Sequence, residues 1–119
     1  MANIMVADDS DAIRLVLRDI LAIGKHTVVA EAVNGEEAVE LFFKNSPDIL
    51  LLDLAMPKKD GLTVLKEIIE KNPEAKVVLI TASDDQKIIT QCLQIGAVSC
   101  ISKPFDFNEV LKQINSSLE

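Results

Sequence analysis

The fold of this chain is decided by the stretch Asp48-Ile49-Leu50-Leu51-Leu52-Asp53-Leu54-Ala55-Met56-Pro57. Its four consecutive large apolar residues, 49–52, show no polar alternation, and prolines at 47 and 57 bound the run. A run this short and this apolar is typical of a strand buried on both faces, as the central strands of parallel sheets are. Asp53 then stands where the strand leaves the sheet, at the edge where open parallel sheets place their chemistry. An acid that only closes a strand and begins a turn is an equal alternative at this point.

The composition indicates one ordinary globular domain, residues 1–119. The chain is 49% hydrophobic and 26% charged, which is enough to bury a single core without disulfides or structural metals. Its formal charge of −7 argues against a nucleic-acid surface, because phosphate binding needs clustered Lys and Arg. No apolar run has the length of a membrane span, and Met1-Ala2-Asn3 does not begin a basic and then apolar secretory signal. We therefore expect a cytoplasmic protein.

The cysteine and aromatic residues argue against further kinds of site. Cys92 and Cys100 lie eight positions apart with no C-x-x-C pair, so we expect free thiols rather than a disulfide or a metal pair. The absence of Trp and Tyr, with only four Phe, leaves little to stack on a flat cofactor or on bases. The single histidine, His26, is predicted in a turn and is interpreted as a surface residue without a catalytic role.

Short aliphatic and β-branched runs alternate with amphipathic segments along the whole chain. Strands are predicted at 4–7, 27–30, 49–52, 77–80 and 98–102, the last near a sheet edge because it is more polar. After each run, apolar residues recur at three- and four-residue steps, the pattern of a helix with one buried face. Five strands alternating with five helices predict an α/β fold, a parallel sheet with helices on both faces. The usual five-stranded solution is the flavodoxin-like, doubly wound (βα)5 sandwich with strand order 2-1-3-4-5.

Helix ends and helix faces can also be predicted. Asn34-x-x-Glu37, Ser83-x-x-Gln86 and Asp106-x-x-Glu109 have the form of capping boxes at helix starts. Gly24 follows the last apolar position of the first helix, which predicts a left-handed C-terminal cap. The buried faces predicted for the first and fourth helices include Val16, Ile88 and Leu93.

Polar side chains end four of the five predicted strands. They are Asp8 and Asp9 after the first strand, Asp53 after the third, Thr81 after the fourth and Lys103 after the fifth. In a parallel sheet these ends share one edge, so three carboxylates crowd the crevice between the first and third strands. Like charges this close destabilise one another unless a cation compensates. Lys103 supplies one positive charge, and an all-oxygen set without His or Cys favours Mg²⁺ over Zn²⁺.

This set of side chains suits phosphoryl chemistry. A metal and an ammonium can share the negative charge of a transferring phosphoryl group, and the Thr81 hydroxyl can hydrogen-bond a phosphoryl oxygen. A carboxylate in the cluster can serve as nucleophile and form an acyl phosphate. Each residue alone has an ordinary explanation: the Asp8-Asp9 pair as a helix cap, Thr81 as a strand residue and Lys103 as a solvated charge. Four strands that each end in a suitable group are poorly explained in that way.

The chain resembles the receiver domains of two-component response regulators, especially the stand-alone, CheY-like ones. The resemblance covers the full length and rests on Asp8-Asp9-Ser10, Asp53-x-x-Met56-Pro57-x-x-Asp60-Gly61, Thr81-Ala82 and Lys103-Pro104-Phe105. It implies that Asp53 is the phosphoacceptor for a sensor histidine kinase or a small acyl phosphate. It also implies that Asp8, Asp9, Asp53 and the backbone carbonyl of Ala55 hold Mg²⁺, that Thr81 is the switch hydroxyl, and that Lys103 pairs with the phosphoryl group. The Lys103–Pro104 bond would be cis.

The resemblance implies a signalling protein whose only catalysis is its own phosphorylation and autodephosphorylation. Phosphorylation would shift an existing conformational equilibrium and so switch the binding of a motor switch, adaptor or phosphotransfer protein. We expect a monomer that binds neither nucleic acid nor membrane. A phosphorelay carrier and the receiver part of a longer regulator stay open as alternatives, because the two chain ends suit a complete protein and a truncation equally.

The sequence departs from the family pattern at one position. The family often has Tyr or Phe three residues before the lysine, as a partner of the switch hydroxyl, where this chain has Cys100. We therefore expect a smaller readout, or one that proceeds by backbone movement. Ala55 and Ser83, two residues beyond Asp53 and Thr81, are small, which predicts a water path to the phosphoryl group and fast to moderate autodephosphorylation.

Two other functional classes fit the sequence less well. A flavin-binding electron carrier would need a Ser/Thr/Gly-rich phosphate loop after the first strand and an aromatic residue to flank the ring, and the chain has neither. A metal-dependent phosphatase acting on external substrates would need a second acid or base and a substrate cap, for which this chain has no spare length.

Overall fold

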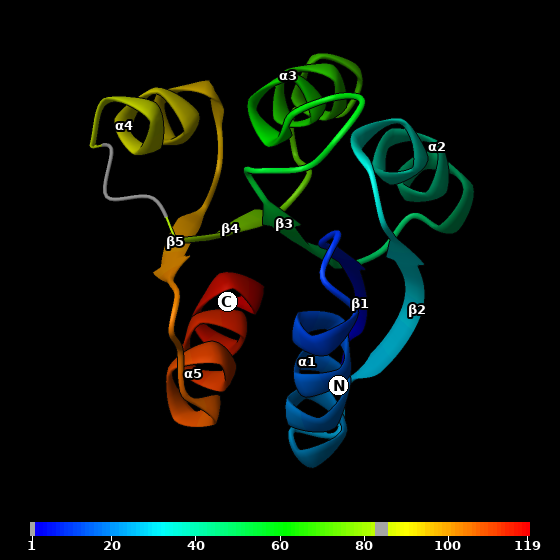
Figure 1. Cartoon of the computed structure of the whole chain (residues 1–119), viewed down its shortest axis with the longest axis vertical. Helices are drawn as coiled ribbons and strands as arrows, with labels where there is room; N and C mark the ends of the chain where they lie inside the picture. Colours follow the sequence, from blue (N-terminus) through cyan, green and yellow to red (C-terminus); the bar gives the residue numbers. More distant parts are fainter. Residues whose placement is uncertain (1, 83–85) are drawn as a thin grey trace.

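A five-stranded parallel sheet runs through the middle of the molecule and carries helices on both faces (Figure 1). The structure, a computed structural model, describes residues 2–82 and 86–119. The strands are β1 (Asn3–Ala7), β2 (Thr27–Ala32), β3 (Ile49–Asp53), β4 (Val77–Thr81) and β5 (Ser99–Ser102). The helices are α1 (Asp11–Ile23), α2 (Gly35–Asn45), α3 (Gly61–Lys71), α4 (Gln86–Ile95) and α5 (Phe107–Leu118). The strand order is β2-β1-β3-β4-β5, which confirms the predicted flavodoxin-like fold.

Strand β3 is the centre of the sheet and is buried along its whole length. It pairs in parallel with β1, through Ile4 opposite Ile49, and with β4, through Leu50 opposite Val77. Ile49 and Leu51 pack against the layer of α1 and α5, whereas Leu50 and Leu52 pack against the layer of α2, α3 and α4 (Figure 1). Both faces are therefore apolar, and full burial of each such side chain stabilises the fold by about 1.5–3 kcal/mol.

The two edge strands are less buried than the centre. Strand β2 lies at one edge and begins where predicted, but it continues two residues further, to Ala32. Strand β5 lies at the other edge, as its polar sequence predicts. Among the described residues, no helix combines the length and the hydrophobicity needed to span a bilayer.

The predicted helix starts are confirmed where the structure describes them. The Asn34 side chain accepts a hydrogen bond from the Glu37 N–H at 2.9 Å, and the Asp106 side chain accepts one from the Glu109 N–H at 2.8 Å. The predicted cap at Ser83 lies outside the described residues.

The prediction of a left-handed cap at Gly24 is wrong by one residue. Gly24 has φ of −77°, and the left-handed residue is Lys25, with φ of 63°. His26 N–H donates to the Leu21 carbonyl at 2.9 Å, and Lys25 N–H donates to the Ala22 carbonyl at 3.0 Å. These are the two hydrogen bonds of a Schellman motif centred on Lys25. The sequence rule places glycine at that position, but here a lysine adopts the conformation.

Three residues predicted on buried helix faces are exposed instead. Val16 is 45% exposed because the inward stripe of α1 runs through Arg14, Leu17 and Leu21 and so turns Val16 outward. Ile88 and Leu93 are 38% and 42% exposed. Ile88 borders an open pocket at the edge of the sheet, and Leu93 lies on a helix at the β5 edge, where fewer elements of the described chain cover it (Figure 1).

The histidine and cysteine predictions hold in part. Cys92 and Cys100 are free thiols, as expected. His26 is half-buried rather than fully on the surface, and its Nδ1 accepts a hydrogen bond from the Ala2 N–H at 3.1 Å. That contact ties the turn after α1 to the start of β1.

The loop after β3 folds back onto the end of the strand. Gly61 N–H donates to the Leu54 carbonyl at 3.0 Å, and a Cβ at Gly61 would lie 2.6 Å from Leu54 Cα and 2.7 Å from the Asp53 carbonyl oxygen. A Cβ at Gly35, the first residue of α2, would lie 1.8 Å from the Lys59 carbonyl oxygen. Because backbone atoms cannot give way as side chains can, both positions require glycine, and the loop is held against the strand end.

Replacing Gly61 by alanine should therefore lower the free energy of unfolding by about 1–3 kcal/mol, measured by urea denaturation. Gly24→Ala is the matched control, because its Cβ would meet Leu111 Cδ2 at 2.4 Å, the movable end of a side chain. We expect a clearly smaller loss there. Equal losses in the two variants would contradict the account of the loop.

Candidate functional site

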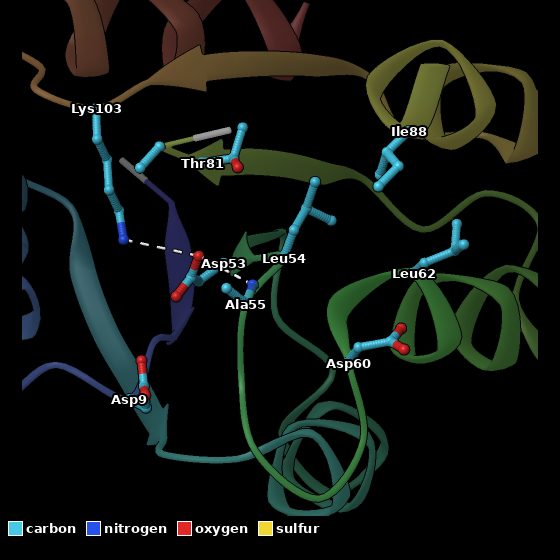
Figure 2. Close-up of a pocket in the computed structure, with 10 residues that line it drawn as sticks. Asp9, Asp53, Leu54, Ala55, Asp60, Leu62, Thr81, Ile88 and Lys103 are labelled. Atoms are coloured by element: carbon cyan, nitrogen blue, oxygen red, sulfur yellow. Dashed lines mark hydrogen bonds and ion pairs between the residues drawn. The ribbon is translucent and has the colours of Figure 1, made fainter. Parts of the chain in front are cut away.

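Asp53 faces a pocket of about 530 Å³ at the carboxyl edge of the sheet (Figure 2). The pocket is lined by Asp9, Asp53, Leu54, Ala55, Asp60, Leu62, Thr81, Ala82, Ile88 and Lys103. Its charged side is formed by Asp9, Asp53 and Lys103, and Leu54, Leu62 and Ile88 form an apolar side (Figure 2). The carboxyl ends of β3, β4 and β5 thus border one cavity, as the parallel pairing of these strands requires.

Three carboxylates gather at this edge. Asp8, Asp9 and Asp53 each offer an oxygen, and these atoms lie within 4.8 Å of one another. Asp8 is 2% exposed and Asp53 is 5% exposed, whereas Asp9 is open to solvent. Asp8 lies behind the pocket, where its Oδ1 accepts a hydrogen bond from the Ser10 N–H at 2.9 Å. The crowding predicted from the strand ends is therefore confirmed.

Lys103 reaches across the end of the sheet to two of these acids. Its Nζ lies 3.0 Å from Asp8 Oδ2 and 3.6 Å from Asp53 Oδ1. Its backbone N–H donates to the Thr81 carbonyl at 2.8 Å, which joins the ends of β4 and β5, and the peptide bond to Pro104 is cis. One ammonium thus contacts two of the three carboxylates, so the cluster keeps an excess of negative charge.

The environment of Asp53 disfavours its charged form. Burial raises the pKa of this carboxyl above its ordinary value of 3.8, and the charges of Asp8 and Asp9 raise the pKa further. The Ala55 N–H, which donates to Asp53 Oδ1 at 3.3 Å, and the Lys103 ammonium lower it. Since the raising causes outweigh the lowering ones, a further cation at the site would stabilise ionised Asp53.

The donor set fits a magnesium ion better than a softer metal. All three candidate ligands are carboxylates, and no His or Cys belongs to the cluster. Hard oxygen donors are those that Mg²⁺ prefers, usually one or two carboxylates together with water and phosphate. Ala55 lines the same pocket beside Asp53. The cluster could therefore hold a hard divalent cation.

Thr81 lies at the end of the neighbouring strand and is 2% exposed. In the register of β3 with β4, Asp53 is opposite Ile80, so Thr81 stands one residue further toward the pocket, which it lines (Figure 2). Cys100 is not among the lining residues. It is half-buried on β5 opposite Leu79, and burial raises the pKa of its thiol, which therefore stays neutral at physiological pH.

Sequence reasoning missed part of the surroundings of the site. The apolar lining by Leu54, Leu62 and Ile88 was not foreseen, because these residues read only as helix or turn positions. A buried arginine on α1, Arg14, was also missed. Its spacing could have indicated burial, because it lies three residues before Leu17 and seven before Leu21, on the same helix face. Ser83, expected to flank the site, lies outside the described residues.

The raised pKa of Asp53 predicts how stability depends on pH without metal. Folded Asp53 holds a proton more tightly than the unfolded chain does, so its favourable contribution is complete below its ordinary value of 3.8. That contribution is lost as the pH rises through the raised folded value. Asp53→Asn should therefore unfold at higher urea concentration than the unchanged protein near about pH 7, with the difference shrinking as the pH falls toward about 4. Added Mg²⁺ should also shrink it, and parallel pH curves for the two proteins would contradict the account.

Comparison with known proteins agrees with the fold. The sequence model of the response regulator receiver domain matches residues 4–115. The chain is 39% identical to the chemotaxis protein CheY of Bacillus subtilis (strain 168) over 116 residues, which cover 98% of this chain and 97% of that protein. It is 37% identical over 118 residues to the probable C4-dicarboxylate response regulator DctR of the same organism, covering 98% of this chain and 50% of that protein.

A solved structure shows the same likeness in three dimensions. The crystal structure of the CheX-CheY-BeF3-Mg²⁺ complex from Borrelia burgdorferi contains a chain that matches this one with a TM-score of 0.95 and 34% identity. The match covers 98% of this chain and 89% of that chain. Because the family model matches residues 4–115 and the CheY of Bacillus subtilis is matched over nearly its whole length, the chain belongs to the receiver domain family of two-component response regulators.

Proposed function

We propose that Asp53 accepts a phosphoryl group from the phosphohistidine of a sensor histidine kinase in a Mg²⁺-dependent reaction. Phosphorylation then switches the binding of a downstream protein, with the chain acting as a stand-alone, chemotaxis-type regulator. One observation carries the proposal. The buried Asp53 carboxylate faces an open pocket beside two further carboxylates and one ammonium, a set that leaves negative charge uncompensated until a cation joins it.

The residues take the following parts in the reaction. Asp8, Asp9, Asp53 and the Ala55 carbonyl would hold Mg²⁺, which when bound supplies positive charge to the phosphoryl oxygens. An Asp53 oxygen attacks phosphorus. The bond to the donor nitrogen breaks as the Asp53 oxygen–phosphorus bond forms, and the donor histidine leaves with a proton on its ring.

Lys103 and Thr81 recognise the product. The Lys103 ammonium is 3.6 Å from Asp53 Oδ1, close enough to pair with a phosphoryl oxygen once that carboxylate is phosphorylated. The Thr81 hydroxyl, at the end of the next strand, donates a hydrogen bond to another phosphoryl oxygen. This pull on the end of β4 shifts an existing conformational equilibrium of the protein toward its signalling state.

The readout beyond Thr81 differs from that of relatives with an aromatic ring at the position of Cys100. The half-buried, neutral Cys100 thiol offers no ring that can swing inward. The signal therefore passes to the surface of α4, β5 and α5 by backbone movement. Ala55 is exposed and small, which supports water access to the phosphoryl group and a fast to moderate autodephosphorylation.

A second arrangement is favoured by a specific observation. The match with this chain covers only half of the length of DctR, so a similar receiver can also form one part of a longer regulator. In such a protein the switch would act on an attached effector rather than on a separate partner. The chemistry at Asp53 would be the same.

Incubation with acetyl phosphate and Mg²⁺ should add the mass of one phosphoryl group to the protein, detected by intact mass spectrometry. Asp53→Asn should abolish the addition, because the nucleophile is lost. Asp60→Asn is the matched control, since Asp60 lines the same pocket but belongs to the α3 cap rather than to the acid cluster. Its label should persist. A label that survives in Asp53→Asn would contradict the assignment, and rapid turnover of many phosphoesters would favour a phosphatase.

A further inference from the structure

A nearly buried arginine lies behind the acid pair, and the reaction described above does not use it. Arg14 is on the inward stripe of α1 and is 8% exposed. Charged side chains are rarely buried unless they are fully paired, so the partners of Arg14 indicate what keeps it there.

The Arg14 guanidinium contacts three different segments of the chain. Its Nη1 donates to the backbone carbonyl of Asp8 at 2.7 Å, and its Nε donates to Glu31 Oε1 on β2 at 3.2 Å. Its Nη2 pairs with the carboxylate of Asp11 in the first turn of α1. Only a planar fork of several donors can satisfy acceptors in such different directions at once.

The carbonyl that Arg14 holds belongs to the peptide between the two acids of the proposed cation site. The Asp8 side chain has direct supports, in the Ser10 N–H and in Lys103 Nζ. Asp9 is exposed, and in the described part of the chain no hydrogen bond to its side chain is found. The direction in which Asp9 leaves the backbone therefore depends on the peptide plane that Arg14 fixes.

The network around Arg14 fixes the position of the Asp8–Asp9 peptide but adds almost no net charge near the acid cluster. Glu31 accepts from Arg14 on one oxygen and pairs with Arg18 Nε at 2.9 Å on the other. Two arginines face Glu31 and Asp11, so the four formal charges cancel. The excess negative charge of the acid cluster is left available for a metal ion.

We propose that Arg14 is a positioning residue for the cation site: by clamping the Asp8–Asp9 peptide it holds the two carboxylates at the spacing that binds Mg²⁺. The inference rests on the proposed function, because it takes Asp8 and Asp9 as metal ligands. Residues that orient metal ligands typically change metal affinity by about 10–100-fold when they are replaced.

Charge and position predict opposite results for Arg14→Gln. Removing a positive charge near three carboxylates should by itself tighten Mg²⁺ binding, whereas loss of the clamp should weaken it. We expect a weakening of about tenfold or more. Arg18→Gln is the matched control, because it removes the same charge from the same helix and the same Glu31 partner but does not touch Asp8. Its Mg²⁺ affinity should stay within about threefold of that of the unchanged protein.

Isothermal titration calorimetry is the suitable measurement, because the chain has neither Trp nor Tyr as a fluorescent reporter. Metal-free urea unfolding of each variant first establishes which proteins are folded under the titration conditions. If Arg14→Gln does not fold, Arg14→Lys takes its place. Lysine keeps the charge without the fork, so it should weaken Mg²⁺ binding by loss of position alone.

The outcomes separate this inference from the proposed function. An unchanged protein that does not bind Mg²⁺ overturns both. An unchanged protein that binds Mg²⁺ and is phosphorylated on Asp53, with Arg14→Gln binding Mg²⁺ equally or more tightly, overturns the role of Arg14 alone. Equal weakening in Arg14→Gln and Arg18→Gln also overturns it, because the effect would then belong to the shared partner Glu31 rather than to the Asp8 carbonyl.

Discussion

Mutual repulsion among three carboxylates at one end of a parallel sheet is the constraint on which the site depends. Asp8, Asp9 and Asp53 lie within 4.8 Å of one another, and Lys103 offsets only part of their charge. Burial of Asp53 destabilises its ionised form further and so raises the pKa of this carboxyl. Like charges this close are relieved either by protonation of one carboxyl group or by a bound cation. The same excess of negative charge that destabilises the metal-free protein would favour the binding of a hard divalent cation.

The fold holds these charges together because the strand beneath them is buried and paired. Strand β3 is buried on both faces and paired on both sides, so Asp53 is attached to the centre of the hydrophobic core. The loop behind it is held by the close approach of Gly61 to the strand end. The repulsion among the carboxylates is thus offset by apolar burial around β3, whereas the edge strand β5 is less buried.

Most of the fold and the composition of the site could be predicted from the sequence, because both depend on local patterns. The apolar run 49–52 identifies a central parallel strand, and parallel pairing then brings the residues after each strand to one edge. The exposure of Val16, Ile88 and Leu93 could not be predicted, since a helix face is buried only where a neighbouring element covers it. The shift of the helix cap from Gly24 to Lys25 depends on hydrogen bonds that sequence rules do not encode.

The clamp by Arg14 shows the same limit at the site itself. Its three acceptors lie just after β1, on β2 and on α1, and no spacing in the sequence relates Asp8, Asp11 and Glu31 to one another. The contacts that position a reactive group therefore depend on the tertiary structure, even where a sequence motif identifies the reactive group itself.

A crystal structure of the protein with Mg²⁺ and beryllofluoride, a phosphoryl mimic, tests the central claim most directly. The account predicts Mg²⁺ in contact with oxygens from the Asp8, Asp9 and Asp53 cluster, and beryllofluoride on an Asp53 carboxylate oxygen with Lys103 paired to a fluorine. Mg²⁺ bound away from the three carboxylates, or beryllofluoride on a different side chain, would contradict it.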